Sequence, residues 1–154
     1  MIAFNLFNIG RAQAGLGKLH EAVEAFQQSV VLRSEIGQQR MEAESRSWLA
    51  YIYLLQDNLI QAHRAVGEVL EFLENNSLDG VEEPFLDYLL CYRVLKANRD
   101  PRAEQLLNSA HTLLQQQASQ ITDQRLRDSF LCNVKAHVEI IQEWEEVEKS
   151  SGGK

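Results

Sequence analysis

Apolar residues recur at spacings of three and four along most of the chain. Leu19, Val23, Phe26 and Val30 follow this spacing, and glutamates and glutamines occupy much of the opposite side. Such a pattern is typical of a helix that buries one side. Because strict alternation of apolar and polar residues is not sustained anywhere, the sequence predicts an all-α protein. The expected helices cover residues 2–15, 18–35, 40–56, 58–75, 84–97, 101–119, 123–132 and 135–148.

Turn residues separate these segments. Asp100 followed by Pro101 predicts an N-cap and a first helical turn, and Asp123 is expected to cap the next helix. Residues 75–83 form the main break in composition, which we interpret as a longer loop rather than a domain linker. The sequence therefore predicts a single domain over residues 1–149 and a flexible tail over residues 150–154.

Small and apolar residues repeat with a period near 40. In each of three units, two small residues lie twelve positions apart, and an apolar residue follows four positions later. The three sets are Gly10, Ala22 and Phe26; Ala50, Ala62 and Val66; and Cys91, Ala103 and Leu107. Small residues let two helices of a hairpin approach closely, so the pattern predicts stacked hairpins. An irregular bundle with chance recurrences is the alternative, and the constant interval of twelve favours the repeat.

This pattern resembles the tetratricopeptide repeat (TPR), with units over residues 3–36, 43–76 and 84–117. The first unit carries the signature best, with Ala22 and Phe26 in the Ala-x-x-x-Phe places. Two features depart from the family pattern. Leu6, Arg46 and Asp87 replace the large aromatic of each first helix, and Ser34, Glu74 and Gln115 replace the proline that ends each unit. The chain thus resembles the long-repeat variants, which implies a right-handed superhelix of antiparallel helix hairpins, an α-solenoid.

Residues 121–149 differ from the three units and are expected to form two capping helices. Their inward side is predicted to consist of Leu126, Phe130, Leu131, Val134, Val138, Ile141 and Trp144. Glu143, Glu145, Glu146 and Glu148 are expected to face water. The segment also resembles the one that closes TPR arrays in large bacterial signalling and regulatory proteins. That resemblance suggests that the chain is one piece of a longer protein.

Charge and composition narrow the function. Lys and Arg total 15 against 22 Asp and Glu, a net charge of −7, which disfavours binding to nucleic acid or to an anionic membrane. Arg93, Lys96, Arg99 and Arg102 form a small basic cluster, but acidic residues flank it. The chain has no apolar run near the roughly 20 residues that span a bilayer and no secretory signal pattern at its start. A cytoplasmic location is the expectation.

The sequence offers no catalytic or metal-binding motif. The four histidines do not share a helix face, and Cys91 and Cys132 are not at a metal-ligand spacing. Gly10, Gly15 and Gly17 lack the preceding strand and the Gly-Lys-Ser/Thr of a phosphate loop. We therefore predict a protein that is not an enzyme and that needs no cofactor or metal.

The TPR resemblance implies that the first helix of each unit lines a concave groove where partners bind. The residues at the matching positions are Phe7, Arg11, Ser47, Trp48, Tyr51, Tyr88, Tyr92 and Lys96. Tyrosine, tryptophan and arginine dominate binding hot spots. Alternatively, Trp48, Tyr51 and Tyr92 pack between the long helices. The family's chaperone-binding members hold a peptide carboxylate with Lys and Asn, and the matching places here are Phe7, Arg11, Trp48 and Leu89, so that clamp is absent.

We interpret the chain as a non-catalytic interaction scaffold that accepts an apolar or amphipathic segment of another protein or of a neighbouring domain. Two alternatives remain open at this point. The groove could bind a small-molecule effector, or the protein could form a homo-oligomer through Ile2, Phe4, Leu6 and Phe7 of the first helix.

Overall fold

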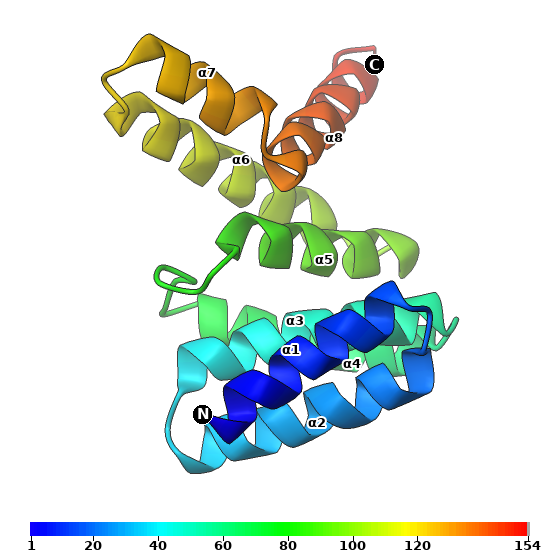
Figure 1. The fold of residues 1–154 in the computed structure, drawn as a ribbon. Helices are drawn as coiled ribbons and strands as arrows, with labels where there is room; N and C mark the ends of the chain where they lie inside the picture. The colour runs from blue at the N-terminus through cyan, green and yellow to red at the C-terminus, as the bar shows by residue number, and fades with distance from the viewer. Residues whose placement is uncertain (154) are drawn as a thin grey trace.

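The computed structural model describes residues 1–153, and in them the backbone is almost entirely helical (Figure 1). The helices are α1 (Ile2–Gly15), α2 (Leu19–Glu35), α3 (Gln39–Leu55), α4 (Leu59–Leu73), α5 (Pro84–Ala97), α6 (Arg102–Gln120), α7 (Gln124–Cys132) and α8 (Lys135–Gly152). The prediction of an all-α protein is confirmed. Helix α8 reaches Gly152, so it includes residues 150–152 of the expected tail, and Lys154 lies outside the described residues.

Side-chain caps fix several helix starts. The Asp123 carboxylate accepts a hydrogen bond from the Leu126 backbone N–H at 3.0 Å, as predicted for a cap. Asp100 accepts one from the Arg102 N–H at 2.9 Å, but α6 begins at Arg102 with Pro101 as its N-cap residue, so the helix starts one residue later than the sequence predicts. Asn58 caps α4 through the Gln61 N–H at 3.3 Å. These oxygens satisfy backbone donors that a helix start leaves without a partner.

The tight turn inside each hairpin contains a residue with positive φ. Gly17 has φ 74°, Asp57 has φ 59° and Arg99 has φ 53°. The left-handed conformation costs an L-residue about 1–2 kcal/mol, and only glycine adopts it freely. The repeat therefore keeps the turn conformation even where its sequence does not supply glycine.

Replacing Arg99 with glycine is expected to raise the free energy of unfolding by about 0.5–1 kcal/mol, because glycine removes the steric cost at positive φ. For a chain of this size the change corresponds to a rise in Tm of roughly 2 °C, which calorimetry would detect. Arg99→Ala is the control, since alanine retains the Cβ and should give no gain. An equal gain from both variants would contradict this explanation.

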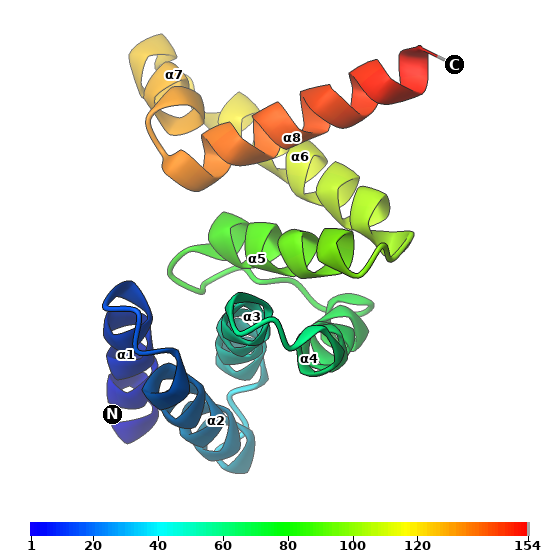
Figure 2. The same ribbon diagram turned by 90° about the vertical axis from the view of Figure 1, so that its right-hand side faces the viewer.

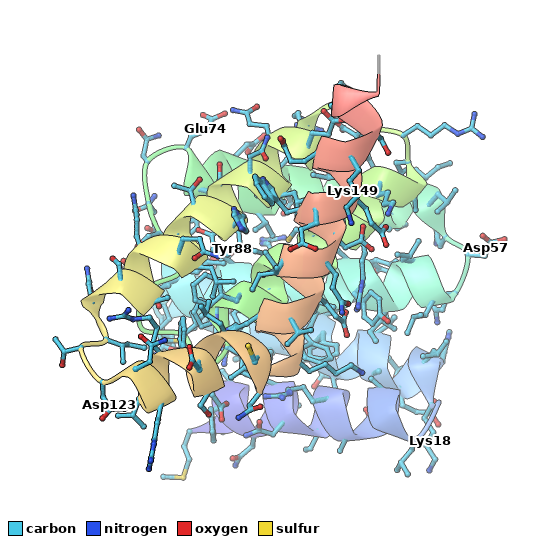
Figure 3. The ribbon with its side chains drawn as sticks, turned by 90° about the horizontal axis from the view of Figure 1, so that it is seen from above. Lys18, Asp57, Glu74, Tyr88, Asp123 and Lys149 are labelled. Carbon is cyan, nitrogen blue, oxygen red and sulfur yellow. The ribbon has the colours of Figure 1, made fainter. Side chains whose placement is uncertain are left out.

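The hairpins stack in chain order. Helix α3 packs against α2, α5 packs against α3 and α4, and α8 packs against α5 and α6 (Figures 1 and 2). Helix α7 packs against α6 and α8, its Phe130 ring meets Phe85 of α5 edge to face at 6.4 Å, and none of its residues is buried. Helix α8, rather than α7, thus takes the place that the first helix of a further unit would have. Figure 3 shows α8 crossing over the helices below it.

The capping segment differs in detail from the prediction. Leu126 of α7 and Val134, the N-cap residue of α8, are exposed, contrary to the prediction. Ile140 is fully buried instead, and Phe130, Leu131, Ile141 and Trp144 are partly buried, as expected of an inward side. The Trp144 ring stacks on His111 of α6 with centroids 4.0 Å apart, and its Nε1 donates to Asn108 Oδ1 at 2.9 Å. These contacts fix α8 on α6.

The repeat-defining small residues lie in the interior. A Cβ placed on Gly10 would approach Phe26 Cζ to 2.9 Å, which is closer than real Cβ contacts. Ala50 and Cys91, the equivalents of Gly10, are buried, and so are Ala22 and Ala62. The close approach of helices that the repeat analysis predicts is therefore present in the structure.

The buried apolar side chains form two separate clusters. The smaller one, which we call the N-terminal cluster, joins α1, α2 and α3 and is built around Phe7, Phe26 and Ile52. The larger one, the C-terminal cluster, extends from α3 through α6 to Ile140 of α8. Helix α3 contributes to both clusters, with Leu49 and Ile52 in one and Ala43 and Ala50 in the other.

Candidate partner-binding surface

The eight residues predicted to face a groove differ widely in exposure. Four are buried, three are half-buried and one is exposed. Phe7, Ser47, Tyr88 and Tyr92 are buried; Arg11, Trp48 and Tyr51 are half-buried; Lys96 is exposed. Only part of the predicted set is thus accessible to a partner in this structure.

Phe7 is buried because it belongs to an aromatic cluster between α1, α2 and α3. Its ring meets Phe26 edge to face at 5.7 Å and Trp48 at 6.4 Å. Trp48 in turn stacks on Phe26 at 5.9 Å. Phe7 therefore stabilises the packing of the first hairpin on α3. Trp48 packs on the same two phenylalanine rings but remains half-exposed to solvent.

Ser47 and Tyr88 are buried at the contacts of α5 with its neighbours. The Ser47 hydroxyl donates to the Ala43 carbonyl at 3.0 Å and accepts from the Cys91 thiol at 3.4 Å. Burial raises the pKa of Cys91 to about 12, so this thiol is unreactive. Tyr88 lines a cavity of about 280 Å³ between α4, α5 and α6, together with Leu70, Leu73 and Leu106 among others.

Two arginines lie over the half-buried aromatic residues. The Arg11 guanidinium carbon lies 5.1 Å from the Trp48 ring centroid, and that of Arg93 lies 5.8 Å from the Tyr51 ring. Trp48 and Tyr51 are three residues apart on α3, so they lie on the same side of that helix. Arg11, Trp48, Tyr51 and Arg93 consequently form a continuous, partly exposed line from α1 across α3 to α5, which we call the inner row.

Acidic residues of the same chain pair with these cations. Arg11 contacts Glu83 at 2.6 Å and Glu82 at 3.6 Å, in the loop before α5. Arg93 pairs with Glu139 of α8. Because the Arg11 and Arg93 side chains remain about one third exposed, both guanidinium groups can still be reached from solvent.

Helix α8 covers the last part of the predicted groove. Glu143 accepts hydrogen bonds from the Tyr92 hydroxyl at 2.9 Å and from Lys96 Nζ at 2.7 Å. Burial opposes ionisation of Glu143, but the hydrogen bonds from Lys96 and Tyr92 outweigh it and lower its pKa. Glu143, which the sequence analysis expected to face water, is thus half-buried against α5. Tyr92 and Lys96 hold α8 in place.

Arg93 was not among the groove residues that the sequence predicted. The sequence analysis assigned Arg93 to a small basic cluster with Lys96, Arg99 and Arg102. In the structure, Arg93, Lys96 and Arg102 pair with acidic residues of the same chain. The repeat equivalents of Arg93, Ala12 and Ile52, are uncharged, so the repeat pattern held no signal for an arginine there.

Residues 1–153 contain no group of three or more His, Cys, Asp or Glu side chains that could hold a metal ion. His63 Nε2 lies 2.7 Å from Asp100 Oδ2, and Arg102 also binds this carboxylate at 2.6 Å. The hydrogen bonds from Arg102 outweigh the effect of burial and lower the pKa of Asp100. The contact between His63 and Asp100 links α4 to the α5–α6 turn. No described helix is long and apolar enough to cross a membrane.

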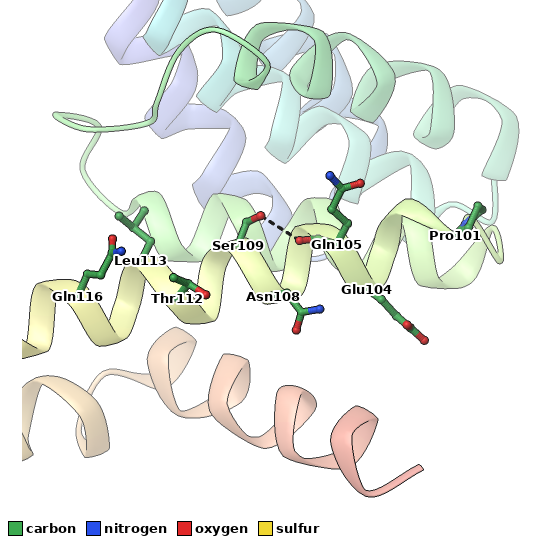
Figure 4. A pocket seen from close by; sticks show the side chains of 8 residues that line it. All are labelled: Pro101, Glu104, Gln105, Asn108, Ser109, Thr112, Leu113 and Gln116. Atoms are coloured by element: carbon green, nitrogen blue, oxygen red, sulfur yellow. Dashed lines mark hydrogen bonds between the residues drawn. The ribbon is translucent and has the colours of Figure 1, made fainter. Parts of the chain in front are cut away.

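A hollow of about 610 Å³ runs along α6, and Figure 4 shows its lining. Apart from Pro101, which precedes α6, the lining side chains come from this one helix, as far as Gln116, and most are polar. The Ser109 hydroxyl donates to the Gln105 carbonyl at 3.0 Å, so it is already used within the helix. The hollow is open and brings no opposing set of side chains together, unlike the inner row.

The stacked hairpins define the class of fold, a TPR-like helical repeat array. Among solved structures, the chain is similar to the crystal structure of a Podosopora anserina putative kinesin light chain with nearly identical TPR-like repeats. The TM-score is 0.62 and the sequence identity 16%, and the match covers 99% of this chain and 68% of that one. The TPR-like fold inferred from the sequence is thereby confirmed. No protein-family model and no curated protein sequence matches the chain.

Proposed function

We propose that the protein is a non-catalytic interaction module that binds a peptide or helix of a partner protein along the inner row. The TPR-like fold commonly mediates protein–protein interaction. The observation that carries the proposal is the continuous line of Arg11, Trp48, Tyr51 and Arg93, in which arginines lie over half-exposed aromatic rings. These residue types supply most of the binding energy in protein interfaces. A cytoplasmic and bacterial signalling context belongs to this proposal as well.

The chemistry of the row favours an acidic, amphipathic segment. Apolar side chains of the partner would cover the edges of Trp48 and Tyr51, and carboxylates would reach the guanidinium groups of Arg11 and Arg93. Helix α8 already binds in this way, with Glu139 on Arg93 and Glu143 on Lys96. These two contacts between α8 carboxylates and cations of α5 therefore support an acidic segment as the partner.

The double variant Tyr51→Ala and Arg93→Ala tests the proposal. A partner is first identified by affinity capture with the wild-type chain and then titrated, as purified protein, by calorimetry. We expect the double variant to bind at least tenfold more weakly, a loss of about 1.4 kcal/mol, with unchanged helicity in circular dichroism. Ile60→Ala is the matched control, because Ile60 is an exposed residue of α4, away from the inner row.

Equal affinities of the double variant and the wild type would place the partner elsewhere on the molecule. A loss in the Ile60→Ala variant alone would assign the contact to α4. Salt dependence adds a second measurement, because pairing between partner carboxylates and the two arginines weakens as ionic strength rises.

A further inference from the structure

The α1 end of the inner row is occupied by two carboxylates of the same chain. Arg11 is the one charged residue of α1, and its guanidinium lies over the Trp48 ring. The same guanidinium binds Glu83 at 2.6 Å and Glu82 at 3.6 Å, more than 70 residues further along the chain. In the described chain α1 packs against α2 and α3 and not against α5, so the Arg11 side chain alone reaches the loop that precedes α5. The two glutamates thus stand where a partner's carboxylates would bind.

The loop that carries these glutamates, residues 74–83, is anchored without them. Leu78 and Val81 are 1% and 7% exposed and belong to the C-terminal cluster. The side chains of Glu82 and Glu83, in contrast, are 64% and 48% exposed. Both carboxylates can therefore leave Arg11 by rotation of their side chains while the backbone of the loop stays in place.

The other end of the row is held more firmly. Arg93 pairs with Glu139, whose side chain is only 24% exposed. The next residue, Ile140, is fully buried and fixes α8 on the array. Exchange of one carboxylate for another is therefore expected first at Arg11.

Exchange at Arg11 has a small energetic cost and a chemical preference. Ion pairs between exposed side chains stabilise a protein little, because water and salt screen the charges. An incoming pair of carboxylates replaces both contacts of Arg11. A single carboxylate replaces one contact and meets repulsion from the glutamate that remains. The arrangement thus favours a partner with two neighbouring acidic residues over a partner with one.

We propose that Glu82 and Glu83 are a built-in competitor of the partner, and that a segment with two neighbouring carboxylates binds the inner row by displacing them from Arg11. This inference rests on the proposed function and adds to it a selectivity and a control of the same surface. The two glutamates keep the affinity of the wild type below the value that the row alone would reach, so segments that are only weakly acidic are rejected.

A peptide with the sequence of residues 135–150, the greater part of α8, is the probe. Its carboxylates bind cations of α5 within the chain, and Glu145 and Glu146 supply the neighbouring pair. The peptide is acetylated, amidated and labelled with a fluorophore, and its binding to the full chain is followed by fluorescence anisotropy. We expect Glu82→Gln combined with Glu83→Gln to lower its dissociation constant about three- to tenfold relative to wild type.

Three controls separate competition at Arg11 from a general effect of charge. Glu21→Gln combined with Glu24→Gln makes the same change in net charge at exposed positions of α2 and should leave the affinity unaltered. Adding Arg11→Gln to the variant of the loop glutamates should abolish the gain, with unchanged helicity. A probe that carries Glu145→Gln and Glu146→Gln should bind that variant and the wild type alike.

Equal affinities of the wild type and the variant of the loop glutamates would overturn the proposal. A gain of the same size in the α2 control, a gain that persists with Arg11→Gln, or absence of binding to every form would overturn it as well. The proposed function has its own measurement in Tyr51→Ala with Arg93→Ala. Weaker binding of this variant without a gain from the loop glutamates would retain the inner row and remove only the competition. The reverse result would retain the competition and restrict recognition to Arg11.

Discussion

Replacing Arg33 with alanine is expected to lower the free energy of unfolding by about 3–5 kcal/mol, the cost of breaking a buried ion pair. Arg33 is 2% exposed and lies where α2 meets α3. Its Nη1 donates to Glu44 Oε2 at 2.9 Å and to Ser45 Oγ at 2.8 Å, and its guanidinium lies 4.7 Å from the Phe7 ring centroid. Alanine would leave the buried Glu44 carboxylate without its cation. Urea unfolding followed by circular dichroism would measure the loss.

Two further variants separate the charge effect from the loss of packing. Arg64→Ala removes an arginine that is 76% exposed and should change stability by less than about 0.5 kcal/mol. Arg33→Met combined with Glu44→Leu replaces both charges with apolar side chains and should recover most of the loss. If Arg33→Ala costs no more than Arg64→Ala, the buried pair contributes nothing to stability.

The second large effect is expected at Asp87, on the first turn of α5. Its carboxylate is fully buried, and neither oxygen has a hydrogen-bond partner in the described chain. Burial, together with the charges of Glu44 and Glu83, raises its pKa well above the usual 3.8, although Arg11 and Arg33 act in the opposite direction. The folded protein therefore retains a proton that the unfolded chain releases near pH 4.

This proton linkage has a definite sign. Where the folded state binds more protons than the unfolded state, stability falls as pH rises. The contribution of Asp87 should thus decrease from about pH 4 upward and level off above its folded-state pKa. Asp87→Asn removes the titration and keeps the shape, so its gain in stability over wild type should be small at pH 3.5 and reach about 1–3 kcal/mol at pH 8.

Urea unfolding of Asp87→Asn and wild type at several pH values would measure this difference. Glu24→Gln, an exposed change on α2, is the control and should leave the pH dependence unaltered. Parallel pH profiles for Asp87→Asn and wild type would show that the buried carboxyl does not control stability.

The helices and their stacking could be predicted from sequence because both depend on local spacing. Gly10 and Phe26 illustrate this: a small residue and a large one at a fixed interval meet across one hairpin, and the structure brings them into contact. The place of α8 could not be predicted in the same way. Its packing on α5 depends on pairs such as Glu143 with Lys96, which are 47 residues apart and follow no repeat.

The candidate site was harder to predict for a related reason. Position within the repeat indicates which side of a helix a residue occupies, but exposure depends on what the neighbouring helices place there. Phe7 and Tyr92 are on the expected helices yet are covered, one by the aromatic cluster with Trp48 and the other by α8. Arg93 belongs to the row because its side chain reaches Tyr51 of another unit.

The two separate clusters of buried side chains affect how the molecule unfolds. In an array where each unit contacts only its neighbours, the first hairpin can open while the remaining hairpins stay folded. One of the two tryptophans packs against each cluster, Trp48 against the N-terminal and Trp144 against the C-terminal cluster. The chain therefore carries a separate intrinsic fluorophore in each half, and their emission distinguishes partial opening from cooperative unfolding of the whole.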